Sequence, residues 1–280
     1  MKKILITGCS GQLGRALNRE YEGEQVQIVN TDVPQLDLTD MDAVLRLVRA
    51  ERPDVIMNCG AMTAVDLCES ESDKAFCINA VGPRNLAIAS RETGAKLFQI
   101  STDYVFSGDT DTPYTETDRP NPLNVYGSTK LAGEQFVKDF AEQYFIIRTA
   151  WLYGEGKNFV GTMLRLSETN DMVRVVGDQV GTPTSAAQLA KMMHRLEPTE
   201  NYGVFHGTCE GQCSWAEFAA EIFRQAGKMT KVENITTREF GAAAKRPAYS
   251  VLDNRMLRLT TDLQMQQWQD ALRVYLMGIL

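Results

Sequence analysis

Apolar and polar positions follow two periods along roughly the first 150 residues, one typical of buried strands and one of amphipathic helices. Apolar runs of strand length occupy residues 3–7, 26–29, 53–58, 96–101 and 144–148. Between them, apolar residues recur at helical spacing after residue 12, around 44–48, from about 70 to 92 and from 126 to about 142. This alternation predicts an α/β protein with a parallel sheet that helices cover on both faces.

Two of these helices carry further expectations. Asp40 is placed to cap the helix around 44–48. In the long helix expected over 70–92, we expect Phe76, Ala80 and Leu86 to point inward. Asn79 would then be a polar residue on an apolar face, so it either helps to order Lys130 through the backbone or a water, or is a solvated helix position.

The last 130 residues have a different pattern, with shorter elements interrupted by glycine and proline. Helices are expected near 186–195 and 214–226, and the second begins with capping-box spacing between Ser214 and Glu217. We therefore expect residues 1–150 to form one α/β domain. Residues 151–280 would form mainly a smaller α/β lobe over the carboxyl edge of the sheet, with some segments returning to the first domain.

A glycine-rich turn follows the first expected strand, with Gly8, Gly11 and Gly14 at a spacing of three residues. Gln12 and Leu13 begin the helix after it. Glycines let the backbone approach a pyrophosphate, which then lies against the free N–H groups of the helix N-terminus. The turn predicts a Rossmann-type, doubly wound dinucleotide-binding sheet, in the variant found in short-chain dehydrogenases; a plain tight turn is the alternative.

Polar residues at the ends of the second and third strands fit the same ligand. Asp32 is within reach of the adenosine ribose hydroxyls and would repel a 2′-phosphate, which slightly favours NADH; it could also be only a turn residue before Pro34. Asp37 could accept from adenine or be a loop carboxylate. The small residues around Ala61, Met62 and Thr63 would let the chain pass beside the cofactor, or only pack strand against helix.

Tyr126 and Lys130 lie four residues apart on an expected helix and so share one face. An ammonium favours a phenolate, so Lys130 would lower the pKa of Tyr126 and make it a proton donor near neutral pH. Thr102 and Asp103 end the fourth strand on the same sheet edge. Thr102 could hydrogen-bond a substrate carbonyl, and Asp103 could orient a sugar hydroxyl or relay a proton; alternatively, both cap a turn.

Composition excludes several other classes of protein. The net charge of −7 and the absence of a basic cluster argue against nucleic acid and membrane surfaces as partners. No apolar run approaches the roughly 20 residues of a membrane span, and the start lacks an export-type cleavage site, so we expect a cytoplasmic protein. The six cysteines lack paired spacing, and His206 with Cys209 and Cys213 has no fourth ligand nearby; no metal is expected.

Three longer motifs resemble the dTDP-4-dehydrorhamnose reductase family of the extended short-chain dehydrogenase/reductase superfamily. They are Ser-Thr-Asp-Tyr-Val-Phe at 101–106, Asn-Val-Tyr-Gly-x-Thr-Lys-Leu-Ala-Gly-Glu at 124–134 and Arg-Thr-Ala-Trp-Leu-Tyr at 148–153. The resemblance covers essentially the whole chain. It implies reduction of the 4-keto group of dTDP-4-dehydro-6-deoxy-L-mannose to dTDP-L-rhamnose, with NADPH or NADH.

Carried over by matching position, the resemblance makes Thr102, Tyr126 and Lys130 the catalytic set. Substrate contacts would be Thr102, Asp103 and Trp151, with Arg246 either on the nucleotide diphosphate or a surface cation. The residues expected to line the dinucleotide are Gly8, Gly11, Gln12, Leu13, Gly14, Asp32, Asp37, Leu38, Ala61, Met62, Thr63, Tyr126 and Lys130.

The sequence leaves open the oligomeric state and two alternative functions. Some members of the family dimerise through a magnesium ion held partly by a glutamate at the position of Ala16, so we expect a monomer or a weak homodimer without that ion. A non-catalytic relative, such as the regulatory subunit of a methionine adenosyltransferase, shares the fold. A nucleotide-sugar epimerase or dehydratase is the nearer alternative, although a dehydratase usually has glutamate where this chain has Tyr104.

Overall fold

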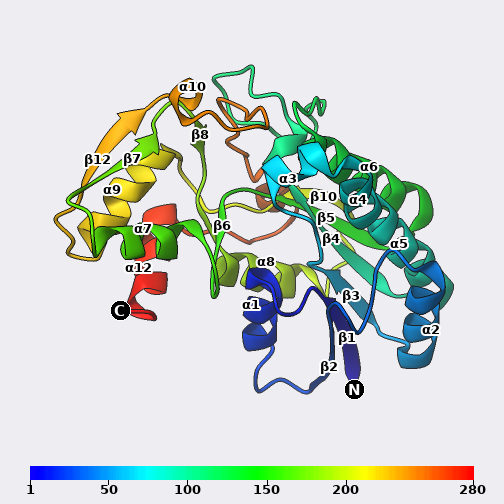
Figure 1. Ribbon diagram of the computed structural model, residues 1–280. Coiled ribbons are helices and arrows are strands. Elements are labelled where there is room, and N and C mark those ends of the chain that lie inside the picture. The colour runs from blue at the N-terminus through cyan, green and yellow to red at the C-terminus, as the bar shows by residue number, and fades with distance from the viewer.

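The computed structural model describes all 280 residues, and a six-stranded parallel sheet forms its centre (Figure 1). The strand order is β10-β5-β4-β3-β1-β2. The chain passes from β1 to β2 on one side and then to β3 on the other, so the order reverses beside β1, where ligands bind in such sheets. The strands are β1 (Lys2–Thr7), β2 (Val26–Thr31), β3 (Val55–Asn58), β4 (Lys96–Thr102), β5 (Tyr144–Thr149) and β10 (Gly203–His206).

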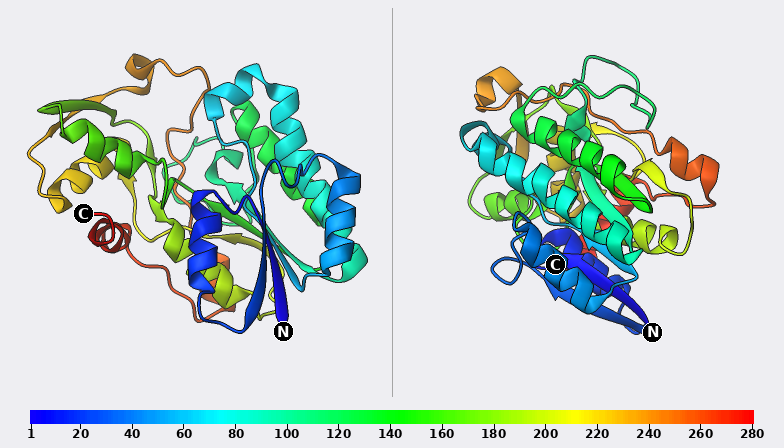
Figure 2. Two further views of the ribbon diagram at one scale, coloured as in Figure 1. Left: turned by 60° about the horizontal axis from the view of Figure 1, so that its bottom comes forward. Right: turned by 90° about the vertical axis from the view of Figure 1, so that its right-hand side faces the viewer.

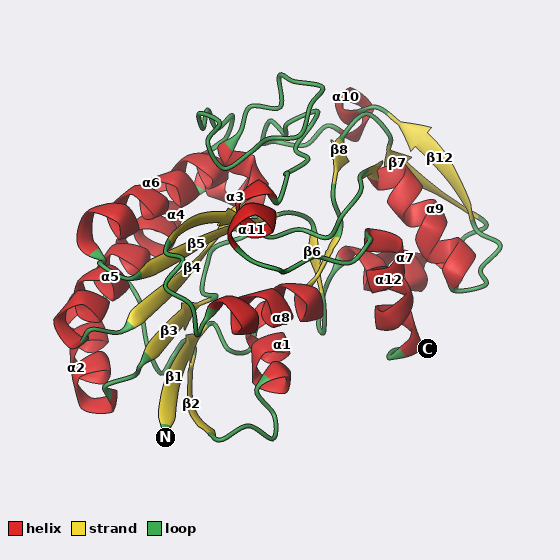
Figure 3. Cartoon of the chain, turned by 180° about the vertical axis from the view of Figure 1, so that it is seen from behind, coloured by secondary structure: helices red, strands yellow, loops and turns green.

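Alternate residues of each strand feed two apolar layers, because successive side chains point to opposite faces. Ile4 and Ile6 pack toward α1 (Gln12–Glu20), α8 (Ala186–Leu196) and α11 (Arg255–Thr260), while Leu5 and Ile56 pack toward the opposite set of helices. Figure 3 shows α8 and α11 on the near side of the sheet. The opposite set is α2 (Met41–Glu51), α5 (Gly82–Thr93) and α6 (Val125–Phe140). The predicted doubly wound α/β fold is confirmed.

The prediction of a single long helix over 70–92 is wrong. The segment consists of short helices around one π-helical turn: α3 (Val65–Ser70), α4 (Ser72–Phe76), η1 (Cys77–Val81) and then α5. Ala80 and Leu86 are buried as expected, but Phe76 is 40% exposed. The changes of helix type rotate the face that each residue presents, so a constant period of 3.6 misplaces Phe76.

A smaller lobe lies beyond the carboxyl edge of the sheet, on the left of Figure 1 and the left panel of Figure 2. Its centre is the parallel pair β7 (Met172–Val176) and β12 (Lys231–Ile235), packed against α9 (Trp215–Gln225). The predicted capping box of Ser214 and Glu217 begins α9. The other elements are η2 (Asp103–Val105), β6 (Leu152–Tyr153), α7 (Phe159–Ser167), β8 (Val180–Gly181), β9 (Thr184–Ser185), β11 (Cys213–Ser214), α10 (Thr237–Phe240) and α12 (Trp268–Met277).

Candidate active site

The turn that joins β1 to α1 needs glycine because the backbone makes close contacts there. Gly8 has a φ of 63°, and a Cβ on it would lie 2.6 Å from the backbone nitrogen of Gly60. A Cβ on Gly14 would lie 2.5 Å from the Cα of Cys9. The N-cap residue of α1 is Gly11, which has no capping side chain. The first N–H groups of α1 are therefore free to bind an anion such as a diphosphate.

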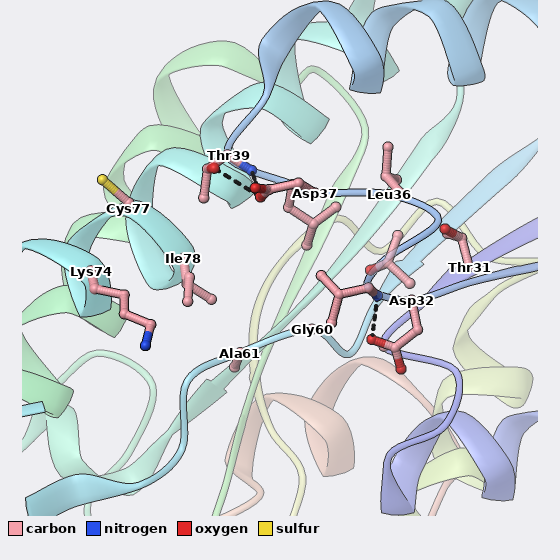
Figure 4. Close-up of a pocket in the computed structure, with 14 residues that line it drawn as sticks. Thr31, Asp32, Leu36, Asp37, Thr39, Gly60, Ala61, Lys74, Cys77 and Ile78 are labelled. Atoms are coloured by element: carbon pink, nitrogen blue, oxygen red, sulfur yellow. Dashed lines mark hydrogen bonds between the residues drawn. The ribbon is translucent and has the colours of Figure 1, made fainter. Parts of the chain in front are cut away.

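A cleft of about 510 Å³ opens beside this turn at the ends of β1, β2 and β3 (Figure 4); we call it the Asp32 cleft. Asp32 directly follows β2, and its Oδ2 accepts hydrogen bonds from the backbone N–H (3.2 Å) and the hydroxyl of Ser10. Partial burial raises the pKa of Asp32, but these bonds and one from the Val33 N–H outweigh it and hold the pKa below its ordinary value. The predicted residues that line this cleft are Gly8, Asp32, Asp37, Leu38 and Ala61.

The walls of the Asp32 cleft come from segments far apart in the sequence. Asp37 lies on one side, where its Oδ1 accepts from the N–H (2.9 Å) and the hydroxyl (2.8 Å) of Thr39. Lys74 and Ile78 line the other side, from α4 and the π-helical turn (Figure 4). Sequence reasoning missed Lys74, which puts a cation in the same cleft as Asp32. No local pattern marks it, because only the fold brings α4 to this edge.

A second cleft of about 610 Å³ adjoins the first, and Ala61 lines both; we call it the Tyr126 cleft. It lies where the glycine turn, the ends of β4 and β5, and the first turns of α6 meet. The structure therefore gathers the predicted catalytic residues beside the helix N-terminus that is free to bind an anion. The predicted residues that line this cleft are Gly11, Gln12, Leu13, Ala61, Thr63, Thr102, Asp103, Tyr126, Lys130 and Trp151.

The position of Tyr126 follows from close packing at the start of α6. Asn124 caps the helix, accepting a hydrogen bond from the Gly127 N–H at 2.7 Å. A Cβ on Gly127 would lie 2.1 Å from the carbonyl oxygen of Tyr104, so only glycine lets α6 approach η2 this closely. This contact helps to bring Tyr126 into the same cleft as Thr102.

Thr102 and Asp103 form a buried polar pair at the end of β4. The Thr102 hydroxyl donates to Oδ1 of Asp103 at 2.9 Å, and the same hydroxyl oxygen accepts from the Tyr104 N–H at 3.1 Å. Burial raises the pKa of Asp103 to about 6, although hydrogen bonds from Ser250 and Thr102 oppose the rise. Its Oδ2 is buried and has no partner. The pair caps a turn, as one alternative held, and also leaves an acceptor free within the cleft.

Lys130 does not lower the pKa of Tyr126 in this structure, so that prediction is wrong. The Lys130 Nζ donates to the carbonyl oxygen of Ile100 at 2.6 Å. Burial lowers the pKa of Lys130 to about 8, while the nearby charge of Glu134 opposes the shift. Burial also raises the pKa of Tyr126 above its ordinary value, and the hydrogen bond with Thr102 only reduces that rise. The spacing of the two residues on one helix face did not reveal that burial would determine the direction of the Tyr126 pKa shift.

Asn79 is buried, so the interpretation of a solvated helix position is wrong. Its Oδ1 accepts from the Met62 N–H at 2.8 Å, and its Nδ2 donates to the Met62 carbonyl (3.1 Å) and the Thr129 hydroxyl (3.2 Å). Asn79 thus ties the segment after β3 to α6, next to Lys130. Met62, which was predicted to line the dinucleotide, lines neither cleft.

Two further predicted residues, Gly14 and Arg246, line neither cleft. Gly14 lies under the turn, where its missing side chain lets α1 pack. Arg246 pairs with Asp66, with 2.8 Å between Nη2 and Oδ2. Trp151 lines the Tyr126 cleft from the segment after β5, and its ring stacks on that of Trp215.

Sequence reasoning also missed the charged loop that borders the Tyr126 cleft. Glu155 accepts from Arg15 at 2.7 Å and also pairs with Arg19, both on α1. Lys157 lines the same cleft, and its carbonyl oxygen accepts from Gln12 at 3.5 Å. The arginines were visible in the sequence, but their partner is 140 positions from Arg15 and 136 from Arg19. A cation beside the glycine turn is the signal that could have directed attention to this loop.

No group of three or more His, Cys, Asp or Glu side chains is arranged to hold a metal ion. The Nδ1 of His206 lies 3.0 Å from the carbonyl oxygen of Asp253, and burial lowers the pKa of this histidine to about 3. None of the helices has the length and apolar character that crossing a bilayer requires.

A doubly wound sheet, a glycine turn and a helix that presents tyrosine and lysine to one cleft define a nucleotide-binding protein of the short-chain dehydrogenase/reductase class. The sequence model of the family described as RmlD substrate binding domain matches residues 1–279. The chain belongs to the dTDP-4-dehydrorhamnose reductase family.

Three similar proteins illustrate how far this relationship extends. A dTDP-4-dehydrorhamnose reductase from Clostridium acetobutylicum is 51% identical, covers 99% of both chains and has a TM-score of 0.97. One from Bacillus anthracis, in complex with NADP, is 46% identical, covers 99% of this chain and 100% of the other, and also has a TM-score of 0.97. The spore coat polysaccharide biosynthesis protein SpsK of Bacillus subtilis is 39% identical over 277 residues, 99% of this chain and 97% of that protein.

Proposed function

We propose that this chain catalyses the NAD(P)H-dependent reduction of the 4-keto group of dTDP-4-dehydro-6-deoxy-L-mannose, giving dTDP-L-rhamnose. The observation that carries the proposal is the gathering of Thr102, Tyr126 and Lys130 in one cleft with the free N-terminus of α1. Family membership over the whole chain supports the same reaction.

The residues of the two clefts fit a dinucleotide. The Asp32 cleft suits the adenosine, with Asp32 on the ribose and apolar walls from Leu38 and Ile78 for the base. The N–H groups at the start of α1 suit the diphosphate. Ala61 and Thr63 continue from there into the Tyr126 cleft, where the nicotinamide would lie. Lys130, which is buried and four residues from Tyr126, would donate to the nicotinamide ribose hydroxyls.

When bound in the Tyr126 cleft, the reduced cofactor would supply the hydride that C4 of the keto-sugar accepts. Thr102 would turn its hydroxyl away from Oδ1 of Asp103 to donate a hydrogen bond to the carbonyl oxygen. Tyr126 would give that oxygen a proton as the alkoxide develops. Such general acid help is typically worth about 10²–10⁴-fold in rate. Lys130 would exchange its hydrogen bond to the Ile100 carbonyl for bonds to the ribose hydroxyls of the cofactor. Its positive charge would then act on Tyr126 through these hydroxyls. Asp103 and Trp151 would contact the sugar.

The proposal has further parts. Residues 1–150 would bind the dinucleotide and residues 151–280 mainly the substrate, with β10, α8 and α11 returning to the sheet. The protein would act in the cytoplasm as a monomer or a weak homodimer, without a metal. Arg246 would reach the nucleotide diphosphate only by leaving Asp66, so its role as a surface ion pair is the alternative.

The test is to mix the protein with the keto-sugar nucleotide and either NADPH or NADH, and to follow loss of the reduced cofactor's absorbance. Stoichiometric release of oxidised cofactor with formation of dTDP-L-rhamnose supports the proposal. An epimerase or dehydratase regenerates its cofactor within each turnover, and a regulatory subunit consumes none. No net oxidation with either cofactor would therefore remove the reductase assignment.

A further inference from the structure

Trp151 has an unusual backbone at the edge of the Tyr126 cleft. Its φ is 46°, one of two positive values among the non-glycine residues of the chain. A bulky residue in this region is strained by roughly 1–3 kcal/mol and persists only where its surroundings hold it. The backbone N–H of Thr184 donates to the Trp151 carbonyl oxygen at 3.2 Å, which fixes one side of the strained residue.

The indole of Trp151 is held by two neighbours in the smaller lobe. Its ring lies parallel to that of Trp215, with 3.6 Å between the centroids and 10° between the planes. Gly181 also lies against the indole, and only the absence of a side chain makes room for the ring. A Cβ on Gly181 would lie 2.5 Å from Cε2 and 2.8 Å from Nε1 of the indole. An alanine at 181 would therefore displace the ring.

These two neighbours form one rigid unit. Gly181 in β8 pairs with Cys213 in β11, and Trp215 begins α9 two residues later. Phe159 supports Trp215 from α7, with 4.7 Å between their ring centroids. The lobe thus fixes the place of an indole whose own backbone follows β5 of the central sheet.

We propose that Trp215 and Gly181 are positioning residues that hold the Trp151 indole in the Tyr126 cleft as one wall of the sugar subsite. The proposal rests on the function proposed above, because it needs a sugar nucleotide in that cleft. Trp215 covers one indole face and Gly181 lies against its Cε2 and Nε1, so the ligand would meet the part of the ring that lines the Tyr126 cleft. A lobe that closed or shifted would move this wall relative to Tyr126, which lies on α6 of the sheet domain.

The first measurement is steady-state kinetics with Trp215→Ala, Trp215→Phe and Gly181→Ala. We expect Trp215→Ala to lower kcat/KM for the sugar nucleotide by about 10-fold, mainly through KM, because it removes the stacking partner. Trp215→Phe keeps an aromatic face and should recover most of that loss. Gly181→Ala should show a similar loss, and the double variant Gly181→Ala with Trp215→Ala should lose less than the product of the single effects, because both act on one ring.

Two controls separate positioning from general damage. The affinity for NADPH, measured by titration, should stay within about 2-fold of the unchanged protein in every variant. Trp268→Phe removes another indole from the same lobe core, where its ring lies against Phe218 rather than Trp151, and should leave the KM for the sugar unchanged. If Trp215→Ala does not fold, the comparison of Gly181→Ala with Trp215→Phe carries the test.

Failure of this inference is distinguishable from failure of the proposed function. Binding of dTDP-L-rhamnose is measured by calorimetry alongside turnover. If the unchanged protein binds the sugar nucleotide without reducing its keto form, the reductase assignment fails, and weaker binding by Trp215→Ala still supports the positioning role. If the unchanged protein turns over normally and both Trp215→Ala and Gly181→Ala match it in KM and binding, the positioning role is wrong.

Discussion

The Asp32 cleft and the Tyr126 cleft share Ala61 but treat their ionisable groups in opposite ways. In the first, burial raises the pKa of Asp32, but its hydrogen bonds together outweigh that effect and hold the pKa below its ordinary value. In the second, burial dominates: the pKa of Asp103 rises to about 6 and that of Lys130 falls to about 8. One cleft thus stabilises a fixed charge, which suits recognition, while the other brings groups toward neutrality, which suits proton transfer.

The largest effect expected is that of Tyr126→Phe, which removes the proton donor of the Tyr126 cleft. We expect kcat to fall by about 10³-fold with little change in NADPH affinity, because only the hydroxyl is lost. Turnover and cofactor titration check this. Tyr144→Phe, at the start of β5 and lining neither cleft, is the matched control. Normal turnover in Tyr126→Phe would contradict the assigned role.

Glu134→Ala tests the buried ion pair of Glu134 and Arg148, which lies beside the Tyr126 cleft. Glu134 is fully buried and accepts from Arg148 Nε at 2.8 Å and Nη2 at 2.7 Å, and from the Ser101 hydroxyl at 2.6 Å. Its removal leaves the buried charge of Arg148 uncompensated. We expect the free energy of unfolding to fall by about 3–5 kcal/mol, measured by denaturant titration.

The exposed pair of Arg273 and Asp270 on α12 gives the control for that loss. Asp270→Ala should change the free energy of unfolding by less than about 1 kcal/mol. If Glu134→Ala and Asp270→Ala lowered the free energy of unfolding equally, burial would not explain the contribution of the Glu134–Arg148 pair.

Asp103→Asn tests the raised pKa directly in the cofactor-free protein. Because the pKa rises from an ordinary value of 3.8 to about 6, folding favours the protonated acid. That contribution is fully present below about pH 4 and is lost as the pH rises through about 6. The stability of Asp103→Asn relative to the unchanged protein should therefore increase over this window by up to about 3 kcal/mol and then level off. Melting temperatures across pH measure it, and a flat difference would count against a raised pKa.

The smallest effect expected is a change of cofactor preference in the Asp32 cleft. Asp32→Asn removes the charge that repels a 2′-phosphate, so the ratio of kcat/KM for NADPH over NADH should rise by about 10-fold. Asp40→Asn removes the same charge nearby and keeps a residue able to cap α2, so its ratio should stay unchanged. A ratio that is the same in both variants would show that Asp32 does not face the ribose.

Local signals in the sequence were enough for most elements of the fold. The apolar runs became the five strands expected in the first 150 residues, and Asp40 caps α2 as predicted, with its Oδ1 3.0 Å from the Ala43 nitrogen. The expected pairing of Ser214 with Glu217 is also present. These features depend on neighbours within a few residues, which a sequence pattern records.

The remaining features depend on groups brought together from distant segments. The exposed Phe76 follows from a π-helical turn that a regular helical period does not contain. The raised pKa of Tyr126 follows from burial against η2, and that burial needs the contact of Gly127 with Tyr104. The motifs predicted which residues of the candidate site lie together, but their ionisation depends on packing that spacing alone does not encode.

The late position of β10 in the sequence affects how the sheet forms during synthesis. It lies beside β5 in the sheet, yet residues 203–206 emerge from the ribosome long after the other five strands. Until then β5 is an open edge, with Phe145 and Ile147 lacking the cover that Phe205 and α8 later give. A fragment that ends at residue 150 would keep this edge exposed, and we expect it to aggregate unless the missing half is supplied in trans.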